Sequence, residues 1–171
     1  MELDDVLTEL VAQSGDRLLR VAYQLTHDRA AAQDLVQEAL LRVYGSVRRR
    51  GGTPEDWYAY LRRAVINEYV RTRRLRSSTE IVTDMVPERA AAGGLEDRTA
   101  DRAQLWAALG ELSERQRAVL VLRYYEGLAD REIAVLLGCR EASVRSLASR
   151  GLAAMRPLVA AASIASTEEG T

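Results

Sequence analysis

The stretch LADREIAVLLGCREASVRSLASRGLAAMR, residues 128–156, has the spacing of a helix-turn-helix. A first helix is predicted over 130–137. The turn at 138–140 begins with a glycine, which can adopt the left-handed conformation that reverses the chain. A second helix is predicted over 141–155, and it is expected to end there because Pro157 follows.

The predicted second helix has two different faces, because successive residues turn by about 100°. Val144, six residues after Gly138, is expected to fill the angle between the helices. It shares the core side with Ala148, Gly151 and Met155, and the opposite side carries Ala142, Arg145, Ser146, Ser149 and Arg150. Short side chains let such a helix enter a DNA major groove, where arginines reach base edges or phosphates. An ordinary solvated face is the alternative, but the tight turn favours DNA binding.

Composition narrows the chemistry that the chain can perform. Its 171 residues, 47% hydrophobic and 29% charged, fit two compact helical domains, an all-α fold. The single cysteine, Cys139, and the single histidine, His27, cannot form a disulfide, a cysteine metal cluster or a Cys/His catalytic set. We therefore expect no catalytic residue, no metal and no cofactor. A cytoplasmic location is expected, because the start MELDD is unlike a signal peptide and no apolar run reaches the roughly 20 residues that span a bilayer.

Residues 3–25 carry apolar side chains at helical intervals, with a break near Ser14-Gly15. This pattern predicts a short leading helix followed by a longer one. Residues 26–28 are turn and capping residues, so the next helix is expected from Arg29 to about Tyr44.

That next helix has an apolar stripe for the core, made by Ala32, Val36, Ala39, Leu40 and Val43. The opposite face carries Asp34, Gln37, Glu38 and Leu41, with Leu35 on its flank. A leucine framed by carboxylates and an amide fits a docking surface for a basic partner. A solvated face with one stray leucine is the alternative, and periodicity by itself favours this alternative.

A strongly basic segment follows. Residues 45–52, GSVRRRGG, are predicted to be a loop, with Thr53 as the N-cap and Pro54 as the first residue of the next helix. That helix places Trp57, Leu61, Ala64 and Val65 on a core side, whereas Arg63, Asn67, Arg71 and Arg74 recur along another. Residues 48–76 hold nine arginines and three carboxylates, a local net charge of +6. Interleaved with Trp57, Tyr58, Tyr60 and Tyr69, this density fits a nucleic-acid strand, although some of the rings must belong to the core.

The remaining chain divides into three parts. Residues 77–100 lack sustained periodicity, are acidic, and are predicted to be a linker between domains. Helices resume at 101–109, and Ser113 with Gln116 forms a capping box for a helix expected to run to Glu126. The domains are therefore expected at 1–76 and 101–158, with a frayed tail at 159–171.

With these elements assembled, the chain resembles a bacterial RNA polymerase sigma factor of the sigma-70 family, in its extracytoplasmic-function class. The most specific piece is DLVQEALLRVY, residues 34–44, which is similar to the family's polymerase-docking motif. This resemblance reverses the preference for a solvated face. The pattern of Ser146, Ala148 and Arg150 resembles the actinobacterial sigma-E-like subgroup.

The resemblance implies three sets of site residues. Those for the clamp of the polymerase's large catalytic subunit are Asp34, Leu35, Gln37, Glu38 and Leu41. Those for the minus-ten promoter element are Arg48, Arg49, Arg50, Trp57, Tyr58, Arg62, Arg63, Asn67, Arg71 and Arg74. Those for the minus-thirty-five element are Arg140, Glu141, Ala142, Ser143, Arg145, Ser146, Ser149 and Arg150. Ala129 stands where the family has a capping residue, so Asp130 is expected to cap the first helix of the helix-turn-helix.

The resemblance also implies the partners. These are core RNA polymerase, through its clamp and upstream-facing flap, promoter DNA, and an anti-sigma factor as a candidate inhibitor, with no insertion into a membrane. The acidic linker is expected to act either as a phosphate mimic in a basic channel of the polymerase or as a passive tether. The main rival hypothesis is a free-standing helix-turn-helix repressor or activator. It explains residues 101–157 but leaves the acidic and basic helices before them without a role. An enzyme is a distant third.

Overall fold

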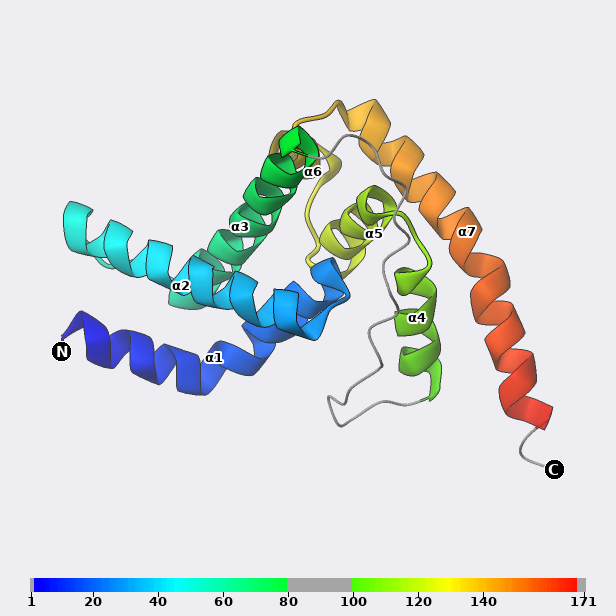
Figure 1. Cartoon of the computed structure of the whole chain (residues 1–171), viewed down its shortest axis with the longest axis horizontal. Coiled ribbons are helices and arrows are strands. Elements are labelled where there is room, and N and C mark those ends of the chain that lie inside the picture. Colours follow the sequence, from blue (N-terminus) through cyan, green and yellow to red (C-terminus); the bar gives the residue numbers. More distant parts are fainter. Residues whose placement is uncertain (1, 80–99, 169–171) are drawn as a thin grey trace. The chain divides into compact units, whose positions relative to one another are not determined.

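The structure is a computed structural model that describes residues 2–79 and 100–168, with side chains described over 2–74 and 102–161. Every regular element in these described residues is a helix, and the chain divides into two compact units at 1–90 and 91–171 (Figure 1). The predicted all-α, two-domain fold is confirmed. The predicted linker falls largely at 80–99, outside the described residues.

The first unit is a bundle of three helices, α1 (Leu3–Thr26), α2 (Arg29–Arg50) and α3 (Trp57–Thr79), each packed against the other two. Its core includes the fully buried side chains of Leu18, Leu25 and Leu61. Burying one such leucine contributes about 1.5–3 kcal/mol. These contacts, more than intrinsic helix propensity, hold the bundle together.

Two predicted interruptions in this unit are wrong. Helix α1 runs without a break through Ser14-Gly15, because Ser14 is buried against the bundle and one glycine inside a helix costs only about 1 kcal/mol. Helix α2 continues through Gly45 to Arg50, so most of the predicted loop at 45–52 is helical. The helix ends at Arg50, and the C-cap residue Gly51 has a φ of 68° and donates its N–H to the carbonyl of Val47 at 2.9 Å.

Aspartate side chains cap the N-termini of α2 and α3. The side chain of Asp28 accepts a hydrogen bond from the N–H of Ala31 at 2.8 Å, after a turn in which His27 has a φ of 55°. The side chain of Asp56 accepts one from the N–H of Ala59 at 2.9 Å. Asp56 therefore takes the role that the sequence assigned to Thr53, and α3 begins at Trp57.

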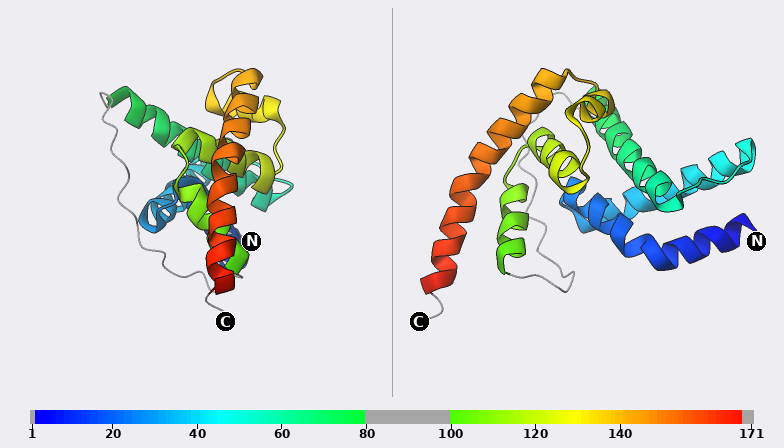
Figure 2. Two further views of the ribbon diagram at one scale, coloured as in Figure 1. Left: turned by 90° about the vertical axis from the view of Figure 1, so that its right-hand side faces the viewer. Right: turned by 180° about the vertical axis from the view of Figure 1, so that it is seen from behind.

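The second unit contains α4 (Ala100–Gly110), α5 (Glu114–Leu120), the π-helix η1 (Val121–Tyr125), α6 (Asp130–Leu137) and α7 (Glu141–Glu168). Helix α7 packs against α4, α5 and α6, and Figure 2 shows it as one long, continuous helix. The predicted capping box of Ser113 and Gln116 is confirmed. The α-helix predicted to reach Glu126 instead widens into η1, where the N–H of Glu126 donates to the carbonyl of Val121 at 3.0 Å.

The helix-turn-helix is confirmed around its turn. Gly138 has a φ of 63°, and Val144, in the first turn of α7, is fully buried. Asp130 does not cap α6. Ala129 is the N-cap residue, and the carboxylate of Glu132 accepts a hydrogen bond from the N–H of Ala129 at 3.0 Å.

The predicted end of the second helix at Pro157 is wrong. Helix α7 passes through Pro157 and reaches Glu168, so residues 159–168 are helical and not frayed. A proline removes one hydrogen-bond donor and bends a helix without necessarily ending it. Pro157 is exposed, so its ring does not disturb the core. Residues 169–171 lie outside the described residues.

Candidate nucleic-acid and protein interfaces

The acidic face of α2 lies on the surface of the first unit, as predicted. Asp34, Gln37 and Glu38 are exposed, and Leu41 is 64% exposed. Leu35 does not belong to this face, because it is 6% exposed and shares the core with Ala32, Ala39 and Val43. Steps of three and four residues along the helix place the three exposed polar residues and Leu41 on one side of α2. We call Asp34, Gln37, Glu38 and Leu41 the acidic face.

The basic face of α3 consists of Arg63, Asn67, Arg71 and Arg74, all of which are exposed. Their spacing of four, four and three residues places them along one side of the helix. Arg62 is half-buried and lies outside this face, rotated by about 100° around the helix from Arg63. Arg48, Arg49 and Arg50 are exposed in the last turn of α2, where cations also interact favourably with the helix dipole.

The structure distinguishes the aromatic rings that the sequence could not. Tyr69 is 5% exposed and belongs to the core. The guanidinium of Arg17 on α1 lies 4.0 Å from the ring centroid of Tyr58, which is half-buried. Trp57 is also half-buried, whereas Tyr60 is 39% exposed. The predicted pair Trp57 and Tyr58 is thus partly covered, and Tyr60 offers the more open ring.

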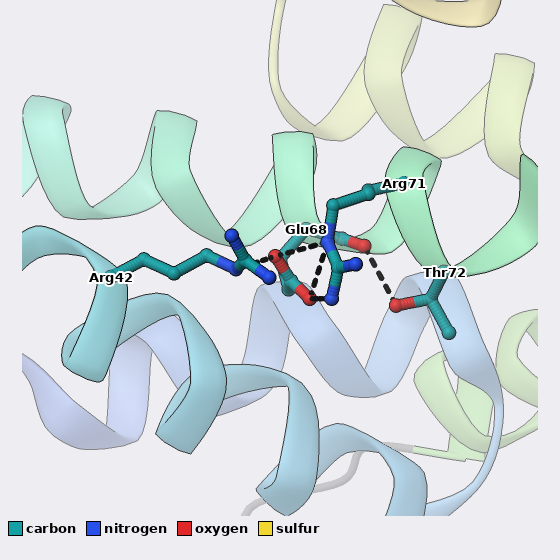
Figure 3. A network of polar contacts seen from close by, with 4 residues as sticks. All are labelled: Arg42, Glu68, Arg71 and Thr72. Atoms are coloured by element: carbon teal, nitrogen blue, oxygen red, sulfur yellow. Dashed lines mark hydrogen bonds and ion pairs between the residues drawn. The ribbon is translucent and has the colours of Figure 1, made fainter. Parts of the chain in front are cut away.

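A network of ion pairs joins α2 to α3 beside the basic face (Figure 3). The carboxylate of Glu68 is 3% exposed, and its Oε2 lies 2.7 Å from Nε of Arg42 on α2. Nε of Arg71 donates to both carboxylate oxygens, at 3.0 and 3.1 Å, and Nη2 of Arg71 also pairs with Oε1. The hydrogen bond from Arg71 is the largest cause that lowers the pKa of Glu68, and burial opposes it.

Sequence reasoning did not select Glu68 or Arg42. The three-residue spacing of Glu68 and Arg71 is a signal for a pair along one helix. The contribution of Arg42 depends on how α2 packs against α3, which a sequence does not state.

The face of α7 assigned to DNA is exposed in the second unit. The assigned residues are all open to solvent: Arg140 in the turn before α7, and Glu141, Ala142, Ser143, Arg145, Ser146, Ser149 and Arg150 on the helix. Nη1 of Arg145 lies 3.8 Å from a carboxylate oxygen of Glu141, and Nε of Arg150 donates to the carbonyl of Ser146 at 3.4 Å. The buried side of the same helix contains Val144, Ala148, Gly151 and Met155, as predicted.

The described residues contain no group of three or more His, Cys, Asp or Glu side chains placed to hold a metal ion. Searched over the same residues, the helices include none that is long and apolar enough to cross a membrane.

Comparisons with known proteins agree with the two-part architecture. Residues 10–79 match the family Sigma-70 region 2, and residues 102–155 match the family Sigma-70, region 4. An RNA polymerase sigma-E factor of Streptomyces coelicolor is 40% identical over 151 residues, which cover 86% of this chain and 82% of that protein. The ECF RNA polymerase sigma factor SigL of Mycobacterium tuberculosis is 34% identical over 143 residues, covering 81% of this chain and 80% of that protein.

A solved structure has the same fold. It is the sigma factor RpoE of Bartonella quintana in complex with the anti-sigma factor NepR, with a TM-score of 0.58 and 23% identity over 92% of this chain and 98% of that one. Together, the two matched regions define an RNA polymerase sigma factor. The chain belongs to the sigma-70 family, in its extracytoplasmic-function class.

Proposed function

We propose that the chain binds core RNA polymerase and directs it to promoters through two DNA-reading units. In this proposal residues 1–76 dock on the polymerase and open the minus-ten element, and residues 101–158 read the minus-thirty-five element. Residues 77–100 link them. The observation that carries the proposal is the exposure of an acidic face on α2 and a basic face on α3 within one three-helix unit.

The acidic face is assigned to the clamp of the large catalytic subunit. Asp34 and Glu38 select basic partners, and Leu41 supplies apolar contact area that a solvated face would not need. In the second unit, the α7 face enters the major groove, and the unit also docks on the upstream-facing flap of the polymerase. Arg145 and Arg150 are the proposed readers of base edges or phosphates.

Minus-ten DNA is assigned to the basic face of α3, to Arg62, and to Arg48, Arg49 and Arg50 at the end of α2. Trp57 and Tyr58, in the first turn of α3, contribute stacking surface as far as their partial exposure allows. The arginines supply the positive charge that a phosphate backbone requires.

The chain performs no chemistry of its own in this proposal, because the polymerase supplies the metal and the reaction. A sigma factor acts where the polymerase acts, so the proposed location is the cytoplasm. The Bartonella quintana relative was solved with an anti-sigma factor, and we extend to this chain the proposal that such an inhibitor binds it.

Co-elution with purified core polymerase tests the proposal against a free-standing repressor, which needs no core. The variant Asp34→Arg/Glu38→Arg should lose core binding by about tenfold or more and keep its helicity. The control Glu9→Arg/Asp16→Arg makes the same charge change on exposed positions of α1 and should bind core normally. Equal binding by both variants would remove the assignment of the acidic face.

Transcription from a promoter library with the reconstituted holoenzyme is the second arm of this experiment. It should yield transcripts that begin at one promoter class and depend on the added chain. DNA binding without core binding or transcription would instead favour the repressor.

A further inference from the structure

Glu68 is a buried carboxylate held between arginines of two helices. Its side chain is 3% exposed, whereas those of Arg42 and Arg71 are 53% and 44% exposed. A buried carboxylate is costly unless charged partners satisfy it, and here each of two guanidinium groups does so. The buried group therefore sets the position of two half-exposed cations from inside the unit.

Arg71 is the more firmly held of the two arginines. Its Nε lies 3.0 and 3.1 Å from the two oxygens of Glu68, and its Nη2 pairs with the same carboxylate, so the contact is made side-on (Figure 3). The hydroxyl of Thr72 donates to the backbone carbonyl of Glu68 at 2.9 Å. A charged pair with several parallel hydrogen bonds fixes the plane of the guanidinium as well as its position.

We propose that Glu68 is a positioning residue that holds Arg71 in the orientation in which its solvent-facing edge binds a phosphate of the promoter strand. This inference rests on the proposed function, which assigns Arg71 to minus-ten DNA. Arg42 connects the same carboxylate to α2, the helix that carries the acidic face. The orientation of Arg71 itself is set by its own hydrogen bonds to Glu68.

The carboxylate also changes the electrostatics of Arg71. Arg71 stays charged, because its hydrogen bond to Glu68 raises its pKa, but the negative charge of Glu68 offsets part of the electrostatic attraction that Arg71 exerts on other anions. Glu38 of the acidic face acts in the same direction and more weakly. An arginine whose charge is offset by a neighbouring carboxylate attracts DNA of any sequence less strongly. An arginine held in a fixed orientation binds better where the phosphate lies in the right place. Glu68 thus lowers non-specific binding and raises binding to the correctly placed strand.

The variant Glu68→Gln tests both effects, because glutamine has the same shape without the charge. In holoenzyme on a promoter found with the library, affinity should fall about tenfold, since Arg71 loses its fixed orientation. Affinity for a promoter-free duplex should rise and depend more steeply on salt. A purely structural role would not raise any affinity, so a fall in both would overturn the proposal.

Arg42→Gln is the matched control, because it removes the tie to α2 but leaves the pair of Arg71 and Glu68 in place. Both affinities should change by less than about threefold. If Arg42→Gln instead reproduces the effect of Glu68→Gln, Glu68 only ties the two helices together and the proposal is wrong.

A double-mutant cycle with Arg71→Ala completes the test. Promoter affinity should fall in Arg71→Ala, and adding Glu68→Gln should then cause no further loss. A persistent tenfold loss in that background overturns the positioning role. If Arg71→Ala weakens promoter binding but Glu68→Gln does not, the inference fails and the proposed function stands. If Arg71→Ala has no effect on promoter affinity, both the inference about Glu68 and the assignment of Arg71 to DNA are wrong.

Discussion

A Cβ atom on residue 151 would lie 3.0 Å from Cδ1 of Leu120, so Gly151 lets α7 cross α5 more closely than a larger residue would allow. Leu120 is 5% exposed and stands before the helix-turn-helix, whereas Gly151 lies at the middle of α7. The crossing therefore helps to set the direction in which α7 presents Arg145 and Arg150.

Gly151→Val is expected to destabilise the second unit by about 1–3 kcal/mol, because the branched side chain would overlap Leu120. The two tryptophans, Trp57 and Trp106, lie in different units, so each unit can be followed separately. Urea unfolding followed by Trp106 fluorescence in a Trp57→Phe background measures the effect.

Gly45→Ala is the matched control for this prediction. A Cβ atom there would meet only Nη1 of Arg49, at 3.4 Å, the far end of a flexible side chain. Because Gly45 lies inside α2, alanine should stabilise the first unit by about 0.5–1 kcal/mol. A loss of stability in the control, or none in Gly151→Val, would contradict the packing argument.

Leu35 and Leu41 are expected to respond oppositely to alanine substitution. Leu35→Ala should destabilise the first unit by about 2–5 kcal/mol, because the side chain is buried. Leu41→Ala should leave unfolding nearly unchanged and weaken binding to core polymerase by about 1–2 kcal/mol, because its exposed side chain is the proposed apolar contact. Trp57 fluorescence in urea and a core-binding titration separate the two effects. Normal core affinity in folded Leu41→Ala would remove Leu41 from the interface.

Local signals in the sequence predicted the turn at Gly138 and the burial of Val144. A left-handed glycine followed six residues later by an apolar β-branched residue restricts the angle at which two helices can be joined. The extents of the helices were less predictable. Gly45 and Pro157 are helix breakers by propensity, yet α2 and α7 continue through them. Intrinsic helix propensity contributes less to the free energy of a helix than its packing against the rest of the fold, and a sequence does not show that packing.

The candidate site residues also fall into two groups, those that the sequence predicted and those that depend on how the helices pack. Periodicity placed Leu41 on the surface correctly but could not decide Leu35, which lies near the boundary of the apolar stripe and is buried. The exposed arginines of α3 followed from their spacing along one helix. The Glu68 network did not, because Arg42 reaches it from α2. Contacts between helices depend on crossing geometry, so they appear only once the helices are placed.

Arg145→Ala is expected to reduce the preference for the correct upstream element by about 1–3 kcal/mol if the guanidinium binds a guanine, because a bidentate contact is lost. If Arg145 binds a phosphate instead, affinity should fall equally for all sequences and the salt slope should decrease by about 1. The same two outcomes distinguish a guanine contact from a phosphate contact for Arg150→Ala. Competition binding of holoenzyme at several salt concentrations measures both quantities. The control Arg102→Ala removes an exposed arginine from α4 and should change neither. Wild-type behaviour in both α7 variants would mean that this face does not bind DNA.

The pairing of Glu68 with Arg71 and Arg42 predicts a dependence of stability on pH in the first unit alone. The hydrogen bond from Arg71 lowers the pKa of Glu68 in the folded protein below its value in the unfolded chain, which is about 4.3. A lowered folded pKa means that the stabilisation is fully present above the unfolded value and is lost as pH falls through the folded one. The free energy of unfolding should therefore decrease more steeply below about pH 5 in the wild type than in Glu68→Gln, which has no proton to gain.

Urea unfolding of the first unit, followed by Trp57 fluorescence from pH 7 to pH 3, measures this difference. The second unit, followed by Trp106, should give the same curve in both proteins because Glu68 lies in the first unit. Parallel Trp57 curves for wild type and Glu68→Gln would mean that the two arginines do not favour the charged form of Glu68 in solution. The ion pairs of Glu68 with Arg42 and Arg71 would then add nothing to the stability of the bundle.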